Sequence, residues 1–151
     1  MQALRKFLNR LFLGLGFSIA CLGTATPLSA FAAERKAPLW KMGIDKRIEA
    51  ATAIIATEFK EGENGNLTEI VSEVLKLDDG VDLHFKVGDV YNEKIENEAG
   101  IRKNKISGQI IFMAGNPAKM VIAGSYAGDK IGGMSGLPIK VLKQKIEAER
   151  N

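Results

Sequence analysis

The 151-residue chain has little of the chemistry that enzymes use most, with one cysteine, Cys21, and one histidine, His84. A single histidine excludes a catalytic group or a metal site that is built from several histidines. Cys21 lies in a segment that we expect to be removed, so the mature chain should have no disulfide and no thiolate nucleophile or ligand. We therefore expect no metal site, no cofactor and no enzymatic activity.

Acidic residues are absent from residues 1–32, which carry the basic residues Arg5, Lys6 and Arg10. These are three of the 21 basic residues, so the other 18 balance the 18 acidic residues. The sequence pI of about 9.0 therefore reflects the first 32 residues alone. The balanced remainder gives no reason to expect nucleic-acid binding.

Residues 1–32 are typical of a secretory signal peptide. The basic residues precede an apolar run at 11–23, which as a helix spans about 20 Å, against roughly 30 Å for a hydrocarbon core. Pro27 ends this run, and the small residues Ala30 and Ala32 predict cleavage after Ala32. We expect a periplasmic or secreted protein whose mature chain has no transmembrane span.

Cys21 leaves open the alternative that the exported protein is a lipoprotein. It follows small residues, as the lipidated cysteine of a lipoprotein does, but Ser18 stands where lipoprotein signals usually have an aliphatic side chain. We favour Cys21 as one more apolar residue of the signal peptide. A lipoprotein anchored at Cys21 is the minor alternative.

Hydrophobic spacing predicts an extended lead-in at 33–43 and a single α+β domain at 44–151. The first predicted element is a helix from 44 to about 60, and the last is a helix that begins at Pro138. One helical face is expected in each case, formed by Ile44, Ile48, Ala51, Ile55 and Phe59 in the first helix and by Ile139, Leu142 and Ile146 in the last.

Strands are predicted where apolar and polar residues alternate, at 81–87, 106–113 and 119–126. The last two strands are joined around Gly115-Asn116-Pro117. Residues 67–77 fit both structures, and we favour a helix there over a strand that leads into the turn at Asp78. Residues 92–104 are polar and predict a surface loop.

The predicted architecture is an antiparallel meander of three or four strands that packs against the N-terminal helix, with a C-terminal helix beside it. In this arrangement Ile48, Ile55 and Phe59 form one face, which covers Leu83, Phe85 and Ile110. The mature domain is long enough to form a core without disulfides or a metal.

Carboxylates leave one catalytic alternative open. His84 lies two residues from both Asp82 and Lys86, as a general base oriented by a carboxylate would. The same pattern is typical of a solvent-facing strand with mixed charges, which we favour. A hydrolase built on Asp82 or Glu69 is the alternative.

Trp40, Tyr91 and Tyr126 are the only tryptophan and tyrosine residues of the mature chain. Both residue types are enriched in protein interfaces, so we expect these three to contact an envelope or extracellular protein. The sequence thus favours a small exported binding or accessory protein that acts through protein–protein contacts. A carrier of a lipid or small apolar ligand, with a pocket between sheet and helix, is a further alternative.

Overall fold

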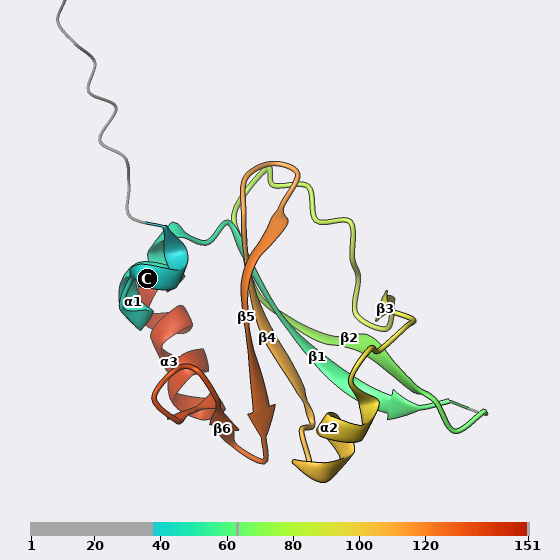
Figure 1. Ribbon diagram of the computed structural model, residues 1–151. Coiled ribbons are helices and arrows are strands. Elements are labelled where there is room, and N and C mark those ends of the chain that lie inside the picture. The colour runs from blue at the N-terminus through green and yellow to red at the C-terminus, as the bar shows by residue number, and fades with distance from the viewer. Residues whose placement is uncertain (1–37, 63, 151) are drawn as a thin grey trace, which may run out of the picture. The chain divides into compact units, whose positions relative to one another are not determined.

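The computed structural model describes residues 38–62 and 64–150, which form an α+β domain with three α-helices and a seven-stranded antiparallel sheet (Figure 1). The predicted α+β class is confirmed, and the sheet is larger than the predicted meander of three or four strands. The predicted signal peptide and residues 33–37 of the predicted lead-in lie outside the described residues.

The sheet has the strand order β3-β2-β1-β4-β5-β6-β7, and each neighbouring pair is antiparallel. In chain order the elements are the 3-10 helix η1 (Leu39–Lys41), α1 (Ile44–Ala50), β1 (Ala53–Glu61), β2 (Leu67–Leu77), β3 (Val90–Asn92), α2 (Glu98–Lys103), β4 (Gly108–Ala114), β5 (Lys119–Ala127), β6 (Lys130–Ile131), β7 (Leu137–Pro138) and α3 (Ile139–Arg150).

The helix predicted from 44 to about 60 is wrong beyond Ala50, where α1 ends. The chain continues as β1, whose first five residues are all buried. Both Ile54 and Ile55 are fully buried because β1 is an inner strand that is covered on its two faces. The sequence of such a strand is a continuous apolar run, and the spacing of its apolar residues also fits one face of a helix.

Three further predictions need correction. Residues 67–77 form β2, so the strand alternative is confirmed and the favoured helix is wrong. Residues 81–87 form no strand, although Val81, Leu83 and Phe85 do pack on the sheet as their alternation indicates. The predicted loop at 92–104 contains α2, whose cap is the side chain of Asn97 accepting a hydrogen bond from the Gly100 N–H.

The other predicted elements are confirmed. β4 and β5 pair as a hairpin around residues 115–117. The C-terminal helix α3 begins at Ile139, directly after Pro138, and buries Leu142 and Ile146. Within the described residues, no helix combines the length and apolar character needed to cross a membrane.

Two hydrophobic clusters lie on opposite faces of the sheet. Helices α1 and α3 cover one face, where Ile48 and Ile146 pack with Ile110. The chain between β2 and β3 covers the other face, where Leu83 and Phe85 pack against the cluster of Ile55 and Ile111 (Figure 1). The single face predicted for Ile48 and Ile55 is therefore divided between the two clusters.

Candidate binding site

The three aromatic residues predicted to contact a partner lie around one strand, β5. Tyr126 belongs to β5. Tyr91 on β3 donates its hydroxyl to the sulfur of Met120 on β5, at 3.5 Å. Trp40 belongs to η1, which lies against β5, and is 57% exposed. β5 is therefore the element that these residues share.

The outer edge of β5 is largely unpaired. On the inner side, β4 pairs with β5 from Lys119 to Tyr126, with a bulge at Val121. On the outer side, β6 pairs with Tyr126 and Ala127 alone. Just before these residues, the N–H of Gly132 donates to the carbonyl oxygen of Ser125. Among the described residues, residues 119–124 therefore have no strand on their outer side.

The direction of the backbone groups on this edge follows from the bond between Gly132 and Ser125. Ser125 directs its carbonyl outward, away from β4. Outward and inward groups alternate along a strand, so Ala123 also directs its N–H and C=O outward. Outside the sheet ladders, no backbone hydrogen bond from a described residue reaches Ala123. A row of such groups is a template for another strand.

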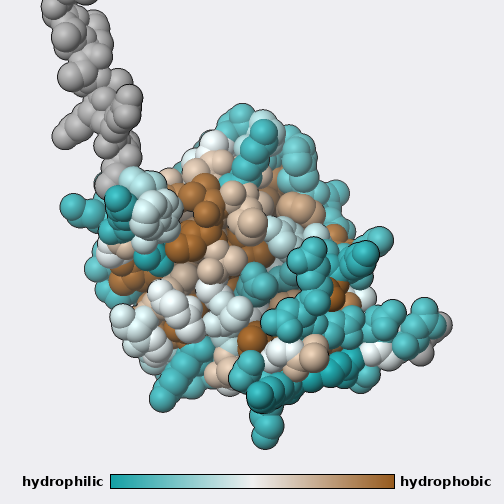
Figure 2. Space-filling model, viewed as in Figure 1, coloured by the Kyte–Doolittle hydropathy of each residue, from teal (hydrophilic) through white to brown (hydrophobic). Residues whose placement is uncertain are grey.

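Apolar side chains line the same edge. Met120 is 57% exposed and Val121 is 43% exposed. Val121 is the extra residue of a β-bulge, because Phe112 pairs with Ile122 and Met113 pairs with Met120. Figure 2 shows hydrophobic side chains gathered between the N-terminal helices and the upper part of β5.

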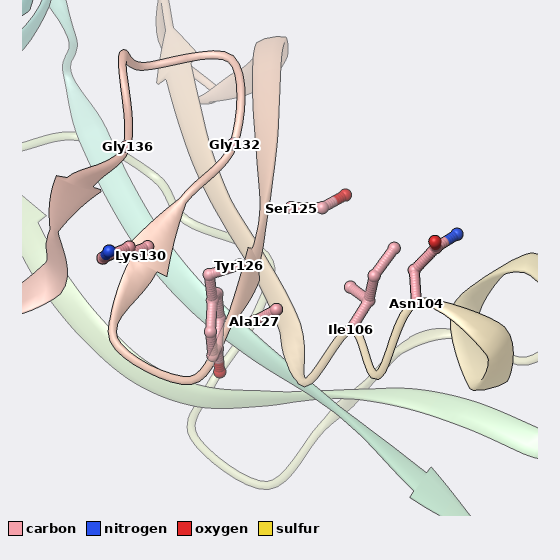
Figure 3. A pocket seen from close by; sticks show the side chains of 8 residues that line it. All are labelled: Asn104, Ile106, Ser125, Tyr126, Ala127, Lys130, Gly132 and Gly136. Atoms are coloured by element: carbon pink, nitrogen blue, oxygen red, sulfur yellow. The ribbon is translucent and has the colours of Figure 1, made fainter.

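A groove of about 440 Å³ adjoins the C-terminal end of this edge. Asn104 and Ile106 form one side of the groove, Ser125, Tyr126 and Ala127 form its centre, and Lys130 and two glycines of the loop after β6 form the other side (Figure 3). Ser125, whose carbonyl oxygen accepts from Gly132, lies in the groove, so the groove begins where the free edge at residues 119–124 ends.

Tyr126 is a wall of the groove and not a mobile contact. Its side chain is buried, and its hydroxyl donates to the carbonyl oxygen of Thr57 at 2.8 Å. Burial raises the pKa of Tyr126, and the negative charges of Glu58 and Glu73 raise it further. The phenol is therefore a neutral donor that holds β5 to β1.

Glu69, one of the two carboxylates considered for a hydrolase, is only 2% exposed. The hydroxyl of Thr57 donates to Glu69 Oε1 at 2.6 Å. Burial raises the pKa of Glu69, and the bond from Thr57 lowers it by a smaller amount. Burial and the charge of Glu69 also raise the pKa of Tyr91. Glu69 is thus a sequestered group under the chain that covers this face.

The other candidate, Asp82, does form the expected pair with His84. Their side chains lie 3.5 Å apart between Asp82 Oδ2 and His84 Nδ1, and each is 63% exposed. The pair stands in an irregular segment that is open to water. Within the described residues, no group of three or more histidine, cysteine, aspartate or glutamate side chains could hold a metal ion.

No protein-family model matches the chain, and no curated protein and no solved structure matches it. Function is therefore argued from the geometry around β5. Sequence reasoning misses the free edge, because the order of strands in a sheet is not a local property. The one available signal is the absence of charge from residues 120–127.

Proposed function

We propose that the protein is an exported binding protein that holds an extended segment of a partner protein at the outer edge of β5. The observation that supports this function is the unpaired edge at residues 119–124. Edge strands of native proteins are usually short, charged or covered, whereas the unpaired edge of β5 carries no charge after Lys119.

The bulge at Val121 limits where a partner strand can pair. It interrupts the regular ladder on one side of Ala123, and on the other side the Ser125 carbonyl already accepts from Gly132. The added strand therefore bonds to the outward N–H and C=O of Ala123. Met120 and Val121 then provide exposed apolar contacts. The 3-10 helix η1, which carries the exposed Trp40, also lies against β5. Backbone bonds supply affinity in strand addition, and alternate side chains supply selectivity.

The location in the envelope or outside the cell is part of the proposal. Its support is the signal peptide predicted at residues 1–32, with Cys21 as the alternative anchoring site. The two other functions have weaker support. The pair of Asp82 and His84 is exposed to water, with each side chain 63% exposed, and the groove next to β5 is an open surface feature that does not enclose a ligand.

The test compares Ala123→Pro with Ala123→Ser. Proline removes the outward N–H of Ala123, which β4 does not use, whereas serine retains it. Each purified variant is used to isolate partners from an envelope extract, and the protein retained is then purified and titrated directly. We expect binding by the wild type and Ala123→Ser, and at least about tenfold weaker binding by Ala123→Pro.

Two further variants separate this function from catalysis. Trp40→Ala should weaken binding of the same purified partner, whereas His84→Ala should leave it unchanged, because His84 lies outside the proposed contact. Equal affinity of Ala123→Pro and Ala123→Ser would reject strand addition at β5. Loss of biological activity in His84→Ala but not in Trp40→Ala would favour an enzyme.

A further inference from the structure

We infer that Met120 is a site of oxidation by peroxide, and that its sulfoxide oxygen accepts a hydrogen bond from Tyr91 that holds the chain between β2 and β3 more firmly to the sheet. This inference goes beyond the proposed function and does not depend on strand addition at β5. It follows from the exposure of the Met120 side chain, the hydroxyl that lies beside its sulfur and the few bonds that hold the covering chain.

Met120 is the most exposed of the four methionines that the structure describes. It is 57% exposed, whereas Met113 is 2% exposed, Met134 is 9% exposed and Met42 is half-buried. Oxidation requires contact between the thioether sulfur and the oxidant, so it favours exposed side chains. Peroxide in solution should therefore react with Met120 first.

A hydrogen-bond donor lies beside this sulfur. The hydroxyl of Tyr91 donates to the sulfur of Met120 at 3.5 Å. Burial raises the pKa of Tyr91, and the charge of Glu69 raises it further, so the phenol remains a neutral donor. A thioether sulfur has two lone pairs and accepts hydrogen bonds only weakly. One lone pair accepts the bond from Tyr91, and the other is available for reaction with peroxide.

The reaction transfers one oxygen atom from the peroxide to the sulfur. A lone pair of the Met120 sulfur attacks one oxygen of hydrogen peroxide, so that an S–O bond forms while the O–O bond breaks. The other oxygen takes up the proton of the first and leaves as water. The sulfur loses two electrons, and the peroxide gains them. The product is a sulfoxide, whose polar oxygen is a stronger acceptor than the thioether sulfur.

The oxidised side chain can keep its contact with Tyr91. Methionine has three rotatable bonds, so the sulfoxide oxygen can turn toward the hydroxyl. Tyr91 itself is held in place, because its ring lies 4.9 Å from the ring of Phe85 and packs against the cluster of Ile55 and Ile111. The hydrogen bond from Tyr91 therefore passes from the sulfur to the oxygen and becomes stronger.

The chain that covers this face of the sheet has few hydrogen bonds to it. Near the C-terminal end of this chain, the N–H of Gly88 donates to the carbonyl oxygen of Val71 at 2.8 Å, and the N–H of Val71 donates to the carbonyl oxygen of Asp89 at 2.9 Å. Among the described residues, no hydrogen bond joins residues 83–87 to the sheet. Tyr91 comes two residues after Asp89, so a stronger bond from its hydroxyl should keep both backbone bonds closed for longer.

The test compares amide exchange in the reduced and the oxidised protein. The purified protein is treated with hydrogen peroxide, the oxidised methionines are located by peptide mass spectrometry, and hydrogen–deuterium exchange is followed by NMR at the amides of Gly88 and Val71. We expect Met120 to oxidise about tenfold faster than Met113 and Met134. Exchange at both amides should then slow by about threefold, because a stronger hydrogen bond lowers the population of the open segment.

Three variants assign this change to the bond between Tyr91 and the oxidised Met120. Tyr91→Phe retains the ring and loses the donor, so its amide exchange should not slow on oxidation. Met120→Leu has no sulfur at this position, and its amide exchange should be the same with and without peroxide. Met42→Leu is the matched control, and it should respond to peroxide as the wild type does.

Two kinds of result would overturn the inference. Oxidation of Met113 or Met134 as fast as that of Met120 would show that Met120 is not a preferred site. Exchange that is unchanged or faster in the oxidised protein, or that slows equally in Tyr91→Phe, would show that the Tyr91 hydroxyl does not hold the sulfoxide. Neither result concerns the proposed function, which the comparison of Ala123→Pro with Ala123→Ser tests separately.

Discussion

The hydroxyl of Tyr126 on β5 donates to the carbonyl oxygen of Thr57 on β1, across the intervening strand β4. That carbonyl is free for Tyr126 because the N–H of Gln109 donates to the side-chain oxygen of Thr57 instead, at 3.1 Å. The same Thr57 hydroxyl donates a hydrogen bond to the carboxyl group of Glu69 on β2. Thr57 thus connects four neighbouring strands and holds the edge strand β5 in register with the rest of the sheet.

The first prediction concerns Gly108, which lies under this connection. A Cβ atom there would be 1.8 Å from the carbonyl oxygen of Thr57 and 2.7 Å from the hydroxyl of Tyr126. Backbone must move to admit it, so Gly108→Ala should lower the free energy of unfolding by about 3 kcal/mol or more. Urea denaturation measures the loss.

Gly62→Ala is the matched control for Gly108→Ala. Its added Cβ would meet the nearest atom, the carbonyl oxygen of Asn66, at an ordinary 3.5 Å. We expect a change within about 0.5 kcal/mol. A Gly108→Ala variant as stable as Gly62→Ala would show that β4 does not approach β1 this closely in solution.

The second prediction concerns the pH dependence of stability. Because burial raises the pKa of Glu69, the folded protein keeps a proton that the unfolded chain releases above a pKa of about 4.5. The folded state then binds more protons, so the free energy of unfolding falls as pH rises through this window. Glu69→Gln should remove this fall and should be at least as stable as the wild type at neutral pH.

Urea denaturation at several pH values between about 4 and 8 measures this difference, with the exposed Glu93→Gln as control. The control should follow the wild type at each pH. A constant difference between the wild type and Glu69→Gln across the range would mean that Glu69 keeps an ordinary pKa in the folded protein.

The elements that sequence reasoning predicts well are those with one buried face and one solvent-exposed face. β5 alternates in burial over its last residues, with Gly124 and Tyr126 buried and Ala123 and Ala127 exposed, and α3 buries one stripe. β1 fails because clusters cover both of its faces, so Ile54 and Ile55 are buried side by side and the period of two disappears. Burial on two sides is set by the whole fold.

The candidate site likewise combines residues that the sequence can identify with features that only the fold determines. Trp40 and Tyr91 can be selected from residue type alone, and both do lie near β5. The unpaired edge cannot be predicted from these residues, because it depends on β6 being two residues long and pairing only with the end of β5. The groove likewise joins Asn104 to Lys130 through tertiary structure.

The third prediction uses the double burial of β1. Ile54→Ala and Ile55→Ala should each lower the free energy of unfolding by about 2–5 kcal/mol, because each leaves a cavity in a different cluster. Lys46→Ala, at an exposed position of α1, should change it by less than about 0.5 kcal/mol. A helix over 44–60 would bury Ile55 but not Ile54, so a small effect of Ile54→Ala would contradict the strand.

The fourth prediction concerns the start of the mature chain. Basic residues, a short apolar run and small residues at Ala30 and Ala32 together predict cleavage after Ala32. We therefore expect N-terminal sequencing of the mature protein to begin at Ala33. Ala32→Asp should block this cleavage and leave the longer chain in the membrane fraction, because an acidic side chain does not suit a small-residue cleavage site. Intact-mass measurement identifies the alternative, since a chain that begins at Cys21 and carries lipid would have a different mass and would be tethered to a membrane.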